Sequence, residues 1–262
     1  MDIKFYYNYT SFPQELKPLI DLHPIIPTRR SEKSWWKNMP SSHEIENFQK
    51  QGWPEPEQAP TMKYCPGIYD FINCGYTVPA WQDFEFFLED NGNIKWRIPD
   101  TLDNAYIIKV HDESQHKGCP MSTGTKGLLK IATPWMIDTP EGYSTIFTKP
   151  FYDHPKGFDV CPGILDTDMD LLTNKQISIF IRIDVKNEVI RINAGQPLLQ
   201  LIPFKRENFS YEICEPTEEF KTMVKRSYWG TASRFGNSLR VDGKDSLRTK
   251  RHQDNKNFEH EK

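Results

Sequence analysis

Residues 176–203, QISIFIRIDVKNEVIRINAGQPLLQLIP, decide the fold class of this chain. The stretch holds three short apolar segments, Gln176–Ile183, Val189–Ile192 and Leu198–Pro203, separated by Asp, Asn and Gly. Short segments rich in β-branched residues and bounded by turn-forming residues are typical of β-strands. Their close spacing predicts a sandwich or barrel and not a series of strand–helix–strand units.

The same pattern continues towards the N-terminus. Asn91-Gly92 lies between the apolar segments Phe84–Leu88 and Ile94–Ile98, which is the strongest short signal for a β-hairpin. The 20 prolines argue against long helices and central strands. We therefore expect an all-β protein with a few short helices. Further strands are expected at 3–9, 105–110, 127–132 and 144–148, and short helices at 31–38, 42–51 and 217–226.

Composition narrows the range of partners and compartments. The net charge of −3 and the pI of about 6.2 provide no basic field for nucleic acid or for an anionic membrane. The longest apolar runs, such as Ile177–Ile183, are too short to span a bilayer, and the N-terminus lacks a signal-peptide pattern. The five cysteines are widely spaced without a C-x-x-C pair, which indicates reduced thiols in a cytoplasm. We expect no nucleic acid, no membrane and no cofactor.

Changes in composition along the chain predict four parts. Residues 1–60 are expected to form an N-terminal strand and a Pro-rich segment that wraps the core. Residues 61–214 form the core domain, and 215–235 a C-terminal helix and docking segment. Residues 236–262 are so polar that we expect a disordered tail.

Four segments of the core resemble the dUTPase and dCTP deaminase superfamily. They occur in the order that the superfamily shows: Pro66–Asp70, Leu129–Tyr143 with its Pro140-Glu141-Gly142-Tyr143 turn, Val160–Asp168, and Ile190–Ile202. The resemblance implies a β-clip fold, and by the same analogy a homo-oligomer such as a trimer.

Nearly the whole chain before the tail also resembles an uncharacterised protein family of tailed phages and bacteria. The residues that carry this resemblance include Trp35–Pro40, Met62–Pro66, Asn73–Pro79 and Gln200–Arg206. It implies a phage or bacterial origin and brings no activity with it.

The dUTPase resemblance implies site residues that are only partly present. In dUTPases a carboxylate activates the water that attacks the α-phosphorus, and here Asp166 matches it. Gln200 matches a Gln that contacts the phosphates in dUTPases. Asp70 matches a dUTPase Asp that lies near the site of the metal ion and the triphosphate. Mg²⁺ would bind this chain only if it hydrolysed nucleotides. The phosphate-gripping Arg-Ser-Gly is replaced by Thr148–Tyr152, in which Lys149 is the one cation. Without those donors the charge of a triphosphate would go largely uncompensated.

Three other groups of residues have both a functional and a structural interpretation. Asp166 and Asp168 form a catalytic carboxylate pair or bond to the backbone of a turn. His111 and His116 hold a metal ion or belong to a solvated loop. The pairs Trp35-Trp36 and Tyr228-Trp229 bind a partner or pack on the chain's own core.

These observations favour a phage-encoded accessory protein that is not an enzyme. We expect an interaction factor for a host or phage protein, or a minor virion component, on a dUTPase-like scaffold. The expected location is the host cytoplasm or the virion. Two alternatives remain open: a nucleotide-binding or nucleotide-hydrolysing enzyme that uses Asp166, and a metal-dependent enzyme at His111 and His116.

Overall fold

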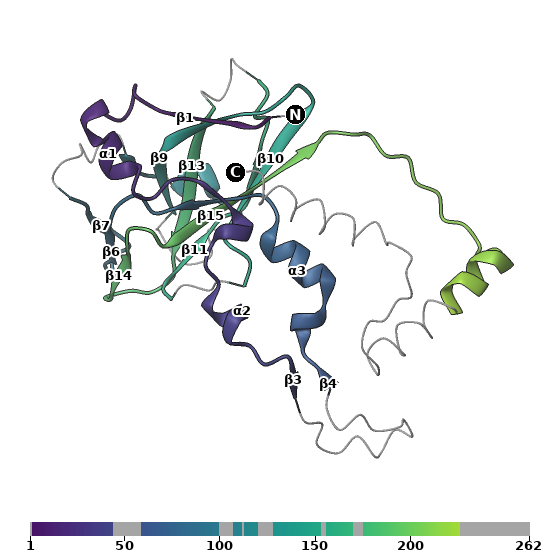
Figure 1. Cartoon of the computed structure of the whole chain (residues 1–262). Coiled ribbons are helices and arrows are strands. Elements are labelled where there is room, and N and C mark those ends of the chain that lie inside the picture. The colour runs from purple at the N-terminus through teal and green to yellow at the C-terminus, as the bar shows by residue number, and fades with distance from the viewer. Residues whose placement is uncertain are drawn as a thin grey trace. The chain divides into compact units, whose positions relative to one another are not determined.

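The structure is a computed structural model that describes residues 2–43, 59–99, 107–111, 113–119, 128–152, 156–169 and 175–225. The chain divides into two compact units. The first comprises Met1–Met39 and Cys65–Ser210, and the second Pro40–Tyr64 and Tyr211–Lys262. Asp166, Asp168, the two candidate histidines and Trp35-Trp36 belong to the first unit. Figure 1 labels most strands of this unit.

One five-stranded antiparallel sheet is built around the predicted strand β13 (Gln176–Ile183). Ile177, Ile179, Ile181 and Ile183 are fully buried and alternate with half-buried residues, as one core-facing side of a strand requires. The strand order is β1-β9-β13-β11, and β8 also pairs with β9. The bounds of the four other strands are Lys4–Tyr7 (β1), Ile108–Val110 (β8), Leu128–Asp138 (β9) and Phe158–Val160 (β11).

Strand β9 is longer than the sequence predicts. The expected strand ended at Ala132, two residues before Pro134, because proline cannot donate a ladder hydrogen bond. In the structure the register of β13 against β9 shifts between Gln176 and Ser178, so the ladder is interrupted opposite Pro134. The irregularity accommodates the proline and lets the strand continue to Asp138.

A second five-stranded antiparallel sheet has the order β12-β10-β15-β5-β2. Gly75, which precedes β5, has φ +71°, and a Cβ at this position would lie 1.9 Å from the carbonyl oxygen of Leu201. Only glycine lets β5 approach β15 this closely. The bounds are Ile26–Pro27 (β2), Tyr76–Pro79 (β5), Tyr143–Thr148 (β10), Gly163–Leu165 (β12) and Pro197–Lys205 (β15).

A three-stranded sheet, β14-β6-β7, contains the predicted hairpin. Asn91-Gly92 connects β6 to β7, and Gly92 has φ +85°, which favours glycine in such a turn. The hairpin prediction is confirmed. The bounds are Phe84–Leu88 (β6), Ile94–Arg97 (β7) and Val189–Ile192 (β14).

The helices are short. In the described part of the first unit they span Lys17–Ile20 (α1), Ser34–Asn38 (α2), Pro66–Asn73 (α3) and Glu113–His116 (α5). Single 3₁₀ turns cover Gln14–Leu16, Thr28–Arg30 and Met62–Tyr64. Pro66 occupies the first turn of α3, where a missing N–H costs nothing.

The second unit contains little regular structure among its described residues. Ser42–His43 (β3) pairs with Ala59–Pro60 (β4), so the prediction of a helix beginning at Ser42 is wrong there, and 44–51 lie outside the described residues. Residues 218–225 are helical, and the Thr217 hydroxyl accepts a hydrogen bond of 3.2 Å from the Phe220 N–H as an N-cap.

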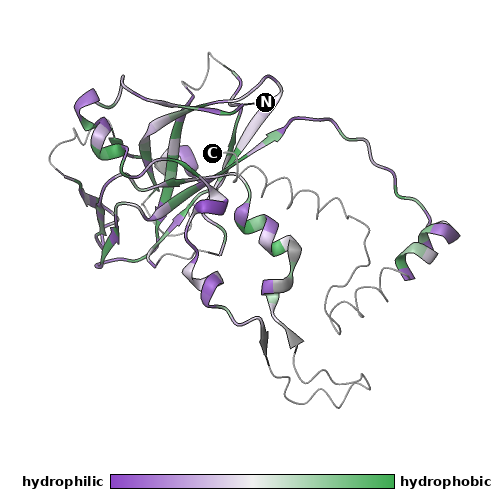
Figure 2. Cartoon of the chain, in the orientation of Figure 1, coloured by the Kyte–Doolittle hydropathy of each residue, from purple (hydrophilic) through white to green (hydrophobic). Residues whose placement is uncertain are grey.

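Most buried apolar side chains of the first unit form one hydrophobic cluster. It includes the fully buried rings of Trp81, Phe84 and Phe86 together with the isoleucines of β13. Apolar residues accordingly follow the inner strands in Figure 2. The mainly β class is confirmed, whereas the barrel that we considered is not found, because the described strands form separate open sheets. Among the described residues, no helix is long and apolar enough to cross a bilayer.

Candidate functional site

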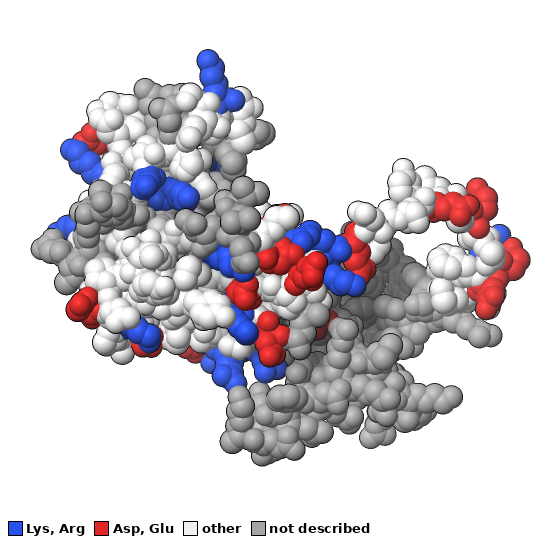
Figure 3. Space-filling view, turned by 90° about the horizontal axis from the view of Figure 1, so that it is seen from above, with Lys and Arg blue, Asp and Glu red and all other residues white. Residues whose placement is uncertain are grey.

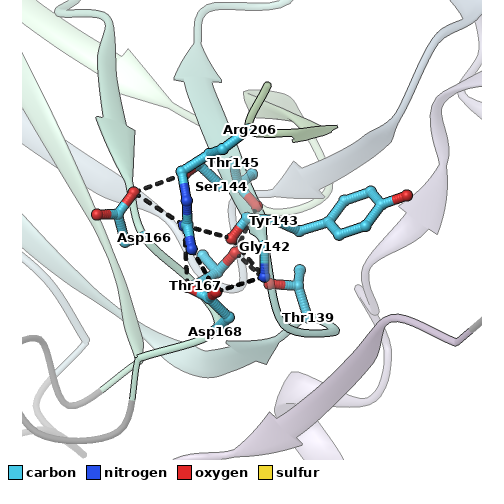
Figure 4. Close-up of polar contacts among 9 residues, drawn as sticks. All are labelled: Thr139, Gly142, Tyr143, Ser144, Thr145, Asp166, Thr167, Asp168 and Arg206. Carbon is cyan, nitrogen blue, oxygen red and sulfur yellow. Dashed lines mark hydrogen bonds and ion pairs between the residues drawn. The ribbon is translucent and has the colours of Figure 1, made fainter. Parts of the chain in front are cut away.

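The carboxylate turn, which we define as Asp166-Thr167-Asp168, follows β12. It faces the turn Pro140–Tyr143, which leads into β10 (Figure 4). Gly142 has φ +81°, and its N–H donates a hydrogen bond of 2.8 Å to Oδ2 of Asp168. The structure therefore brings together two of the segments that resemble dUTPases, through a backbone-to-carboxylate contact.

Arg206, directly after β15, holds the carboxylate turn in place. Its Nη1 donates to the Asp168 carboxylate, the Ser144 hydroxyl and the Tyr143 carbonyl, at 2.9 Å in each case, and lies 3.2 Å from Oδ1 of Asp166. Its Nη2 pairs with the other oxygen of Asp168, which makes a bidentate contact. The ring of Tyr143 points away from this cluster (Figure 4).

Three buried threonine hydroxyls support the turn from within. Oγ1 of Thr167 lies 2.7 Å from that of Thr139 and 3.0 Å from that of Thr145. Each pair joins residues more than 20 positions apart, so the hydroxyls fasten the carboxylate turn to both ends of the facing turn. Buried hydroxyls that satisfy one another fix a single arrangement.

The two aspartates differ in their surroundings. The Arg206 guanidinium and the Gly142 N–H hold the pKa of Asp168 below its usual value, and its side chain is only 6% exposed. Asp168 in turn raises the pKa of Arg206. Asp166 is 46% exposed, and one of its oxygens accepts a hydrogen bond of 2.5 Å from the Ser144 hydroxyl. Asp168 is therefore a structural carboxylate, and Asp166 presents its remaining oxygen to solvent.

The other residues implied by the dUTPase resemblance have partners of their own. Gln200 is buried; its Nε2 donates to the Cys74 carbonyl at 2.8 Å, and its Oε1 accepts from the Phe151 N–H at 3.3 Å. Lys149 forms an ion pair of 2.8 Å with Asp159. Asp70 is exposed on α3. Across the described parts of the chain, no hydrogen bond or ion pair joins Asp166 to any of these residues.

His111 and His116 lie on the wall of one cavity. Nδ1 of His111 lies 2.9 Å from Oε1 of Gln115, and its ring lies 5.0 Å from that of Phe180. His116 is buried. Within the described ranges, no group of three or more His, Cys, Asp or Glu side chains is placed to hold a metal ion. Both histidines thus line one cavity, and the described residues supply no third ligand beside them.

Trp35 and Trp36 belong to what we call the aromatic surface. It comprises Trp35, Trp36, Tyr69, Phe71, Phe151 and Tyr152, from α2, α3 and the segment after β10. Trp35 lies 5.8 Å from Tyr152, and Trp36 lies 6.2 Å from Tyr69, by ring centroids. Both tryptophans are half-buried, so they pack against neighbouring rings and also reach solvent. The second aromatic pair, Tyr228-Trp229, lies outside the described residues.

Sequence reasoning missed several members of these groups. It assigned no role to Arg206 or Ser144, which complete the carboxylate turn, nor to Tyr69, Phe71, Phe151 and Tyr152. One signal in the sequence pointed to the aromatic side chains: Phe151-Tyr152 stands after β10, where the dUTPase resemblance leads one to expect residues that grip a phosphate. Tyr152 has φ +59°, a conformation that only a few per cent of non-glycine residues adopt.

Comparison with known proteins assigns no family. No protein-family model and no curated protein matches the chain. Several solved structures match it, and dUTPases are among them. The EIAV enzyme is 15% identical over 56% of this chain and 87% of its own, with a TM-score of 0.31.

Two phage dUTPases match at similar levels. That of phage phi11 of S. aureus is 11% identical over 74% of this chain and 97% of its own, with a TM-score of 0.28. That of Staphylococcus bacteriophage 80alpha is 12% identical over 68% and 85%, with a TM-score of 0.27. Identities and TM-scores this low transfer neither an activity nor a site to this chain.

Charges of both signs are interspersed over the face drawn in Figure 3. Opposite charges at the surface also form ion pairs, such as Arg191 with Glu85 at 2.9 Å and Lys17 with Asp21 at 2.5 Å. The described residues on this face therefore form no continuous basic or acidic field.

Proposed function

We propose that this chain is a phage-encoded, non-catalytic protein that acts by binding another protein through a dUTPase-like β scaffold. One observation carries the proposal: Arg206 contacts both aspartates of the carboxylate turn. An arginine that is committed to two carboxylates is not available to grip a phosphate.

The surroundings of the turn support the same conclusion. A triphosphate needs several cationic or N–H donors, because its charges lose hydration on binding. Lys149 is paired with Asp159, and both ends of the Gln200 amide are bonded to the backbone. The residues that resemble the phosphate site thus serve to hold the fold together.

The aromatic surface supplies the feature through which a partner would bind. Tyr69, Phe71 and Tyr152 are 40–45% exposed although they contact one another or neighbouring rings. Clustered, partly exposed aromatic side chains are enriched where proteins bind proteins. We assign this surface to a host or phage protein that the chain meets in the host cytoplasm or in the virion, and we propose that the chain is a homotrimer by analogy with dUTPases.

The catalytic part of the proposal is tested by incubating the purified chain with dUTP and Mg²⁺ and measuring pyrophosphate release. We expect no release above that of buffer, and no difference between the wild type and Asp166→Asn. Turnover by the wild type that Asp166→Asn abolishes would contradict the proposal and favour the nucleotide-hydrolysing alternative.

The binding part is tested by affinity purification from infected and uninfected host cells. The double variant Tyr69→Ser with Tyr152→Ser should lose a partner that the wild type retains. Tyr211→Ser is the matched control, because Tyr211 is 90% exposed and lies outside the aromatic surface. Equal recovery of every partner by all three proteins would refute the assignment of this surface. Light scattering of the purified chain measures its molar mass and so tests the proposed trimer. The mass of a monomer at micromolar concentration would contradict the proposed trimer.

A further inference from the structure

A cavity of about 570 Å³ lies beside β12, on the side of β9 and β13 opposite to the buried isoleucines. Along β13 the side chains of Ser178 and Phe180 alternate with these isoleucines and line the cavity. Leu165 of β12 and His116 of α5 complete the wall. The volume lies within the range of small-molecule sites, and the site is separate from the aromatic surface.

His116 is a buried polar group with an unused atom. The residue is 7% exposed, and its Nδ1 has no hydrogen-bond partner among the described residues. The residue lines the cavity, but its Nδ1 atom is itself closed off from solvent, so His116 contributes a buried aromatic wall and not an accessible polar contact.

Lys130 gives the cavity a positive charge. It lies directly opposite Phe180 across the β9–β13 pair, and its Nζ is 6.0 Å from the centre of the Phe180 ring. Among the described residues, no Asp or Glu belongs to the lining and no carboxylate forms an ion pair with Lys130. A half-buried cation without a counter-charge favours an anionic ligand.

The remaining wall is mainly aromatic and aliphatic. The Phe180 ring is flanked by the His111 ring at 5.0 Å, with an angle of 57° between the planes. Phe147, Ile164 and Leu199 add apolar surface. Walls of this kind favour a flat, apolar body over a sugar or a peptide.

We propose that this cavity binds a small planar aromatic monocarboxylate. The ring system lies against Phe180 in the part of the wall that His116 helps to form, and the carboxylate pairs with Lys130. The inference does not depend on the proposed function, since it uses none of the residues of the aromatic surface or the carboxylate turn.

The test uses 6-hydroxy-2-naphthoate as the probe and its neutral amide as the reference, with both affinities measured by titration calorimetry on the full chain. We expect the wild type to bind the carboxylate about tenfold more tightly than the amide, as one charge-assisted contact implies. Lys130→Met should abolish this preference. Lys95→Met, a change to an exposed lysine of β7, should leave it unchanged.

A second readout reports on His116 itself. Long-range ¹H–¹⁵N spectra of the histidine rings should show a shift of the His116 Nδ1 resonance on addition of the carboxylate, in the wild type and in Lys95→Met. The inference is overturned if the wild type binds no probe at millimolar concentration, or if the probe binds without moving that resonance. It is also overturned if Lys130→Met discriminates between the carboxylate and the amide as well as the wild type does. If Lys130→Met does not fold, Lys130→Gln takes its place in this comparison. Tyr69→Ser with Tyr152→Ser should bind the probe normally, which separates this result from the proposed function.

Discussion

Two buried glutamines should respond in opposite ways to the same substitution by leucine. Gln200 and Gln82 are 1% and 4% exposed. The Gln200 amide bonds the Cys74 carbonyl at 2.8 Å and the Phe151 N–H at 3.3 Å. Within the described residues, neither Nε2 nor Oε1 of Gln82 has a hydrogen-bond partner.

The magnitudes follow from these contacts. Gln200→Leu removes two hydrogen bonds, each contributing about 1 kcal/mol, and leaves two backbone groups unpaired in a part-buried site at a further cost. We expect a loss of about 3 kcal/mol in the free energy of unfolding. Gln82→Leu removes two unpaired polar atoms and adds apolar contact, so the stability should stay within about 0.5 kcal/mol of the wild type or rise by about 1 kcal/mol.

Urea unfolding followed by tryptophan fluorescence measures both changes. With a slope of about 3 kcal/mol per molar urea, Gln200→Leu should lower the midpoint by about 1 M. Gln14→Leu, at an exposed position of the 3₁₀ turn Gln14–Leu16, is the control and should change the stability by less than about 0.5 kcal/mol. The reasoning is refuted if Gln82→Leu destabilises as much as Gln200→Leu, or if Gln200→Leu has no effect.

Three further predictions follow from single positions. Because the pKa of Asp168 is lowered by Arg206, its ionised form stabilises the fold above the usual aspartate pKa of 3.8, and this contribution is lost as the pH falls through the lowered value. Asp168→Asn should therefore reduce stability at pH 7 and lose less stability on acidification than the wild type; parallel acid-unfolding curves would contradict this. Gly75→Ala should yield little folded protein by circular dichroism, because its Cβ would collide with the Leu201 carbonyl, and a wild-type melting temperature would disprove the close approach. Ile179→Ala should cost about 3 to 4 kcal/mol in urea unfolding, since the residue is fully buried in β13, whereas a loss under about 1 kcal/mol would show that it does not belong to the core.

The carboxylate turn shows that a resemblance in sequence does not by itself establish an activity. Asp166 and Asp168 stand in a segment that resembles dUTPases, yet the contacts that surround them are internal to the chain. Residues that face a substrate in one protein can stabilise a turn in another, because a carboxylate pairs equally well with a protein cation.

The sequence alone determined the regular elements whose signals are local. Strands β13 and β14 have the predicted bounds, and the hairpin at Asn91-Gly92 forms where its turn chemistry predicts. Side-chain alternation and turn residues act over a few neighbouring positions, so they can be read along the chain. Elements with weaker local signals, such as β5, β12 and α3, were not predicted.

The tertiary structure decided which distant side chains meet. Arg206 reaches Asp168 across 38 positions, Gln200 reaches Cys74 across 126, and three separate segments build the aromatic surface. No local pattern encodes these contacts, because they depend on the order in which strands pair and on the positive φ of residues such as Gly75 and Tyr152. The sequence could reveal that phosphate-gripping residues are missing, but only the pairing of β10 with β12 and β15 brings Arg206 and Ser144 to the carboxylate turn.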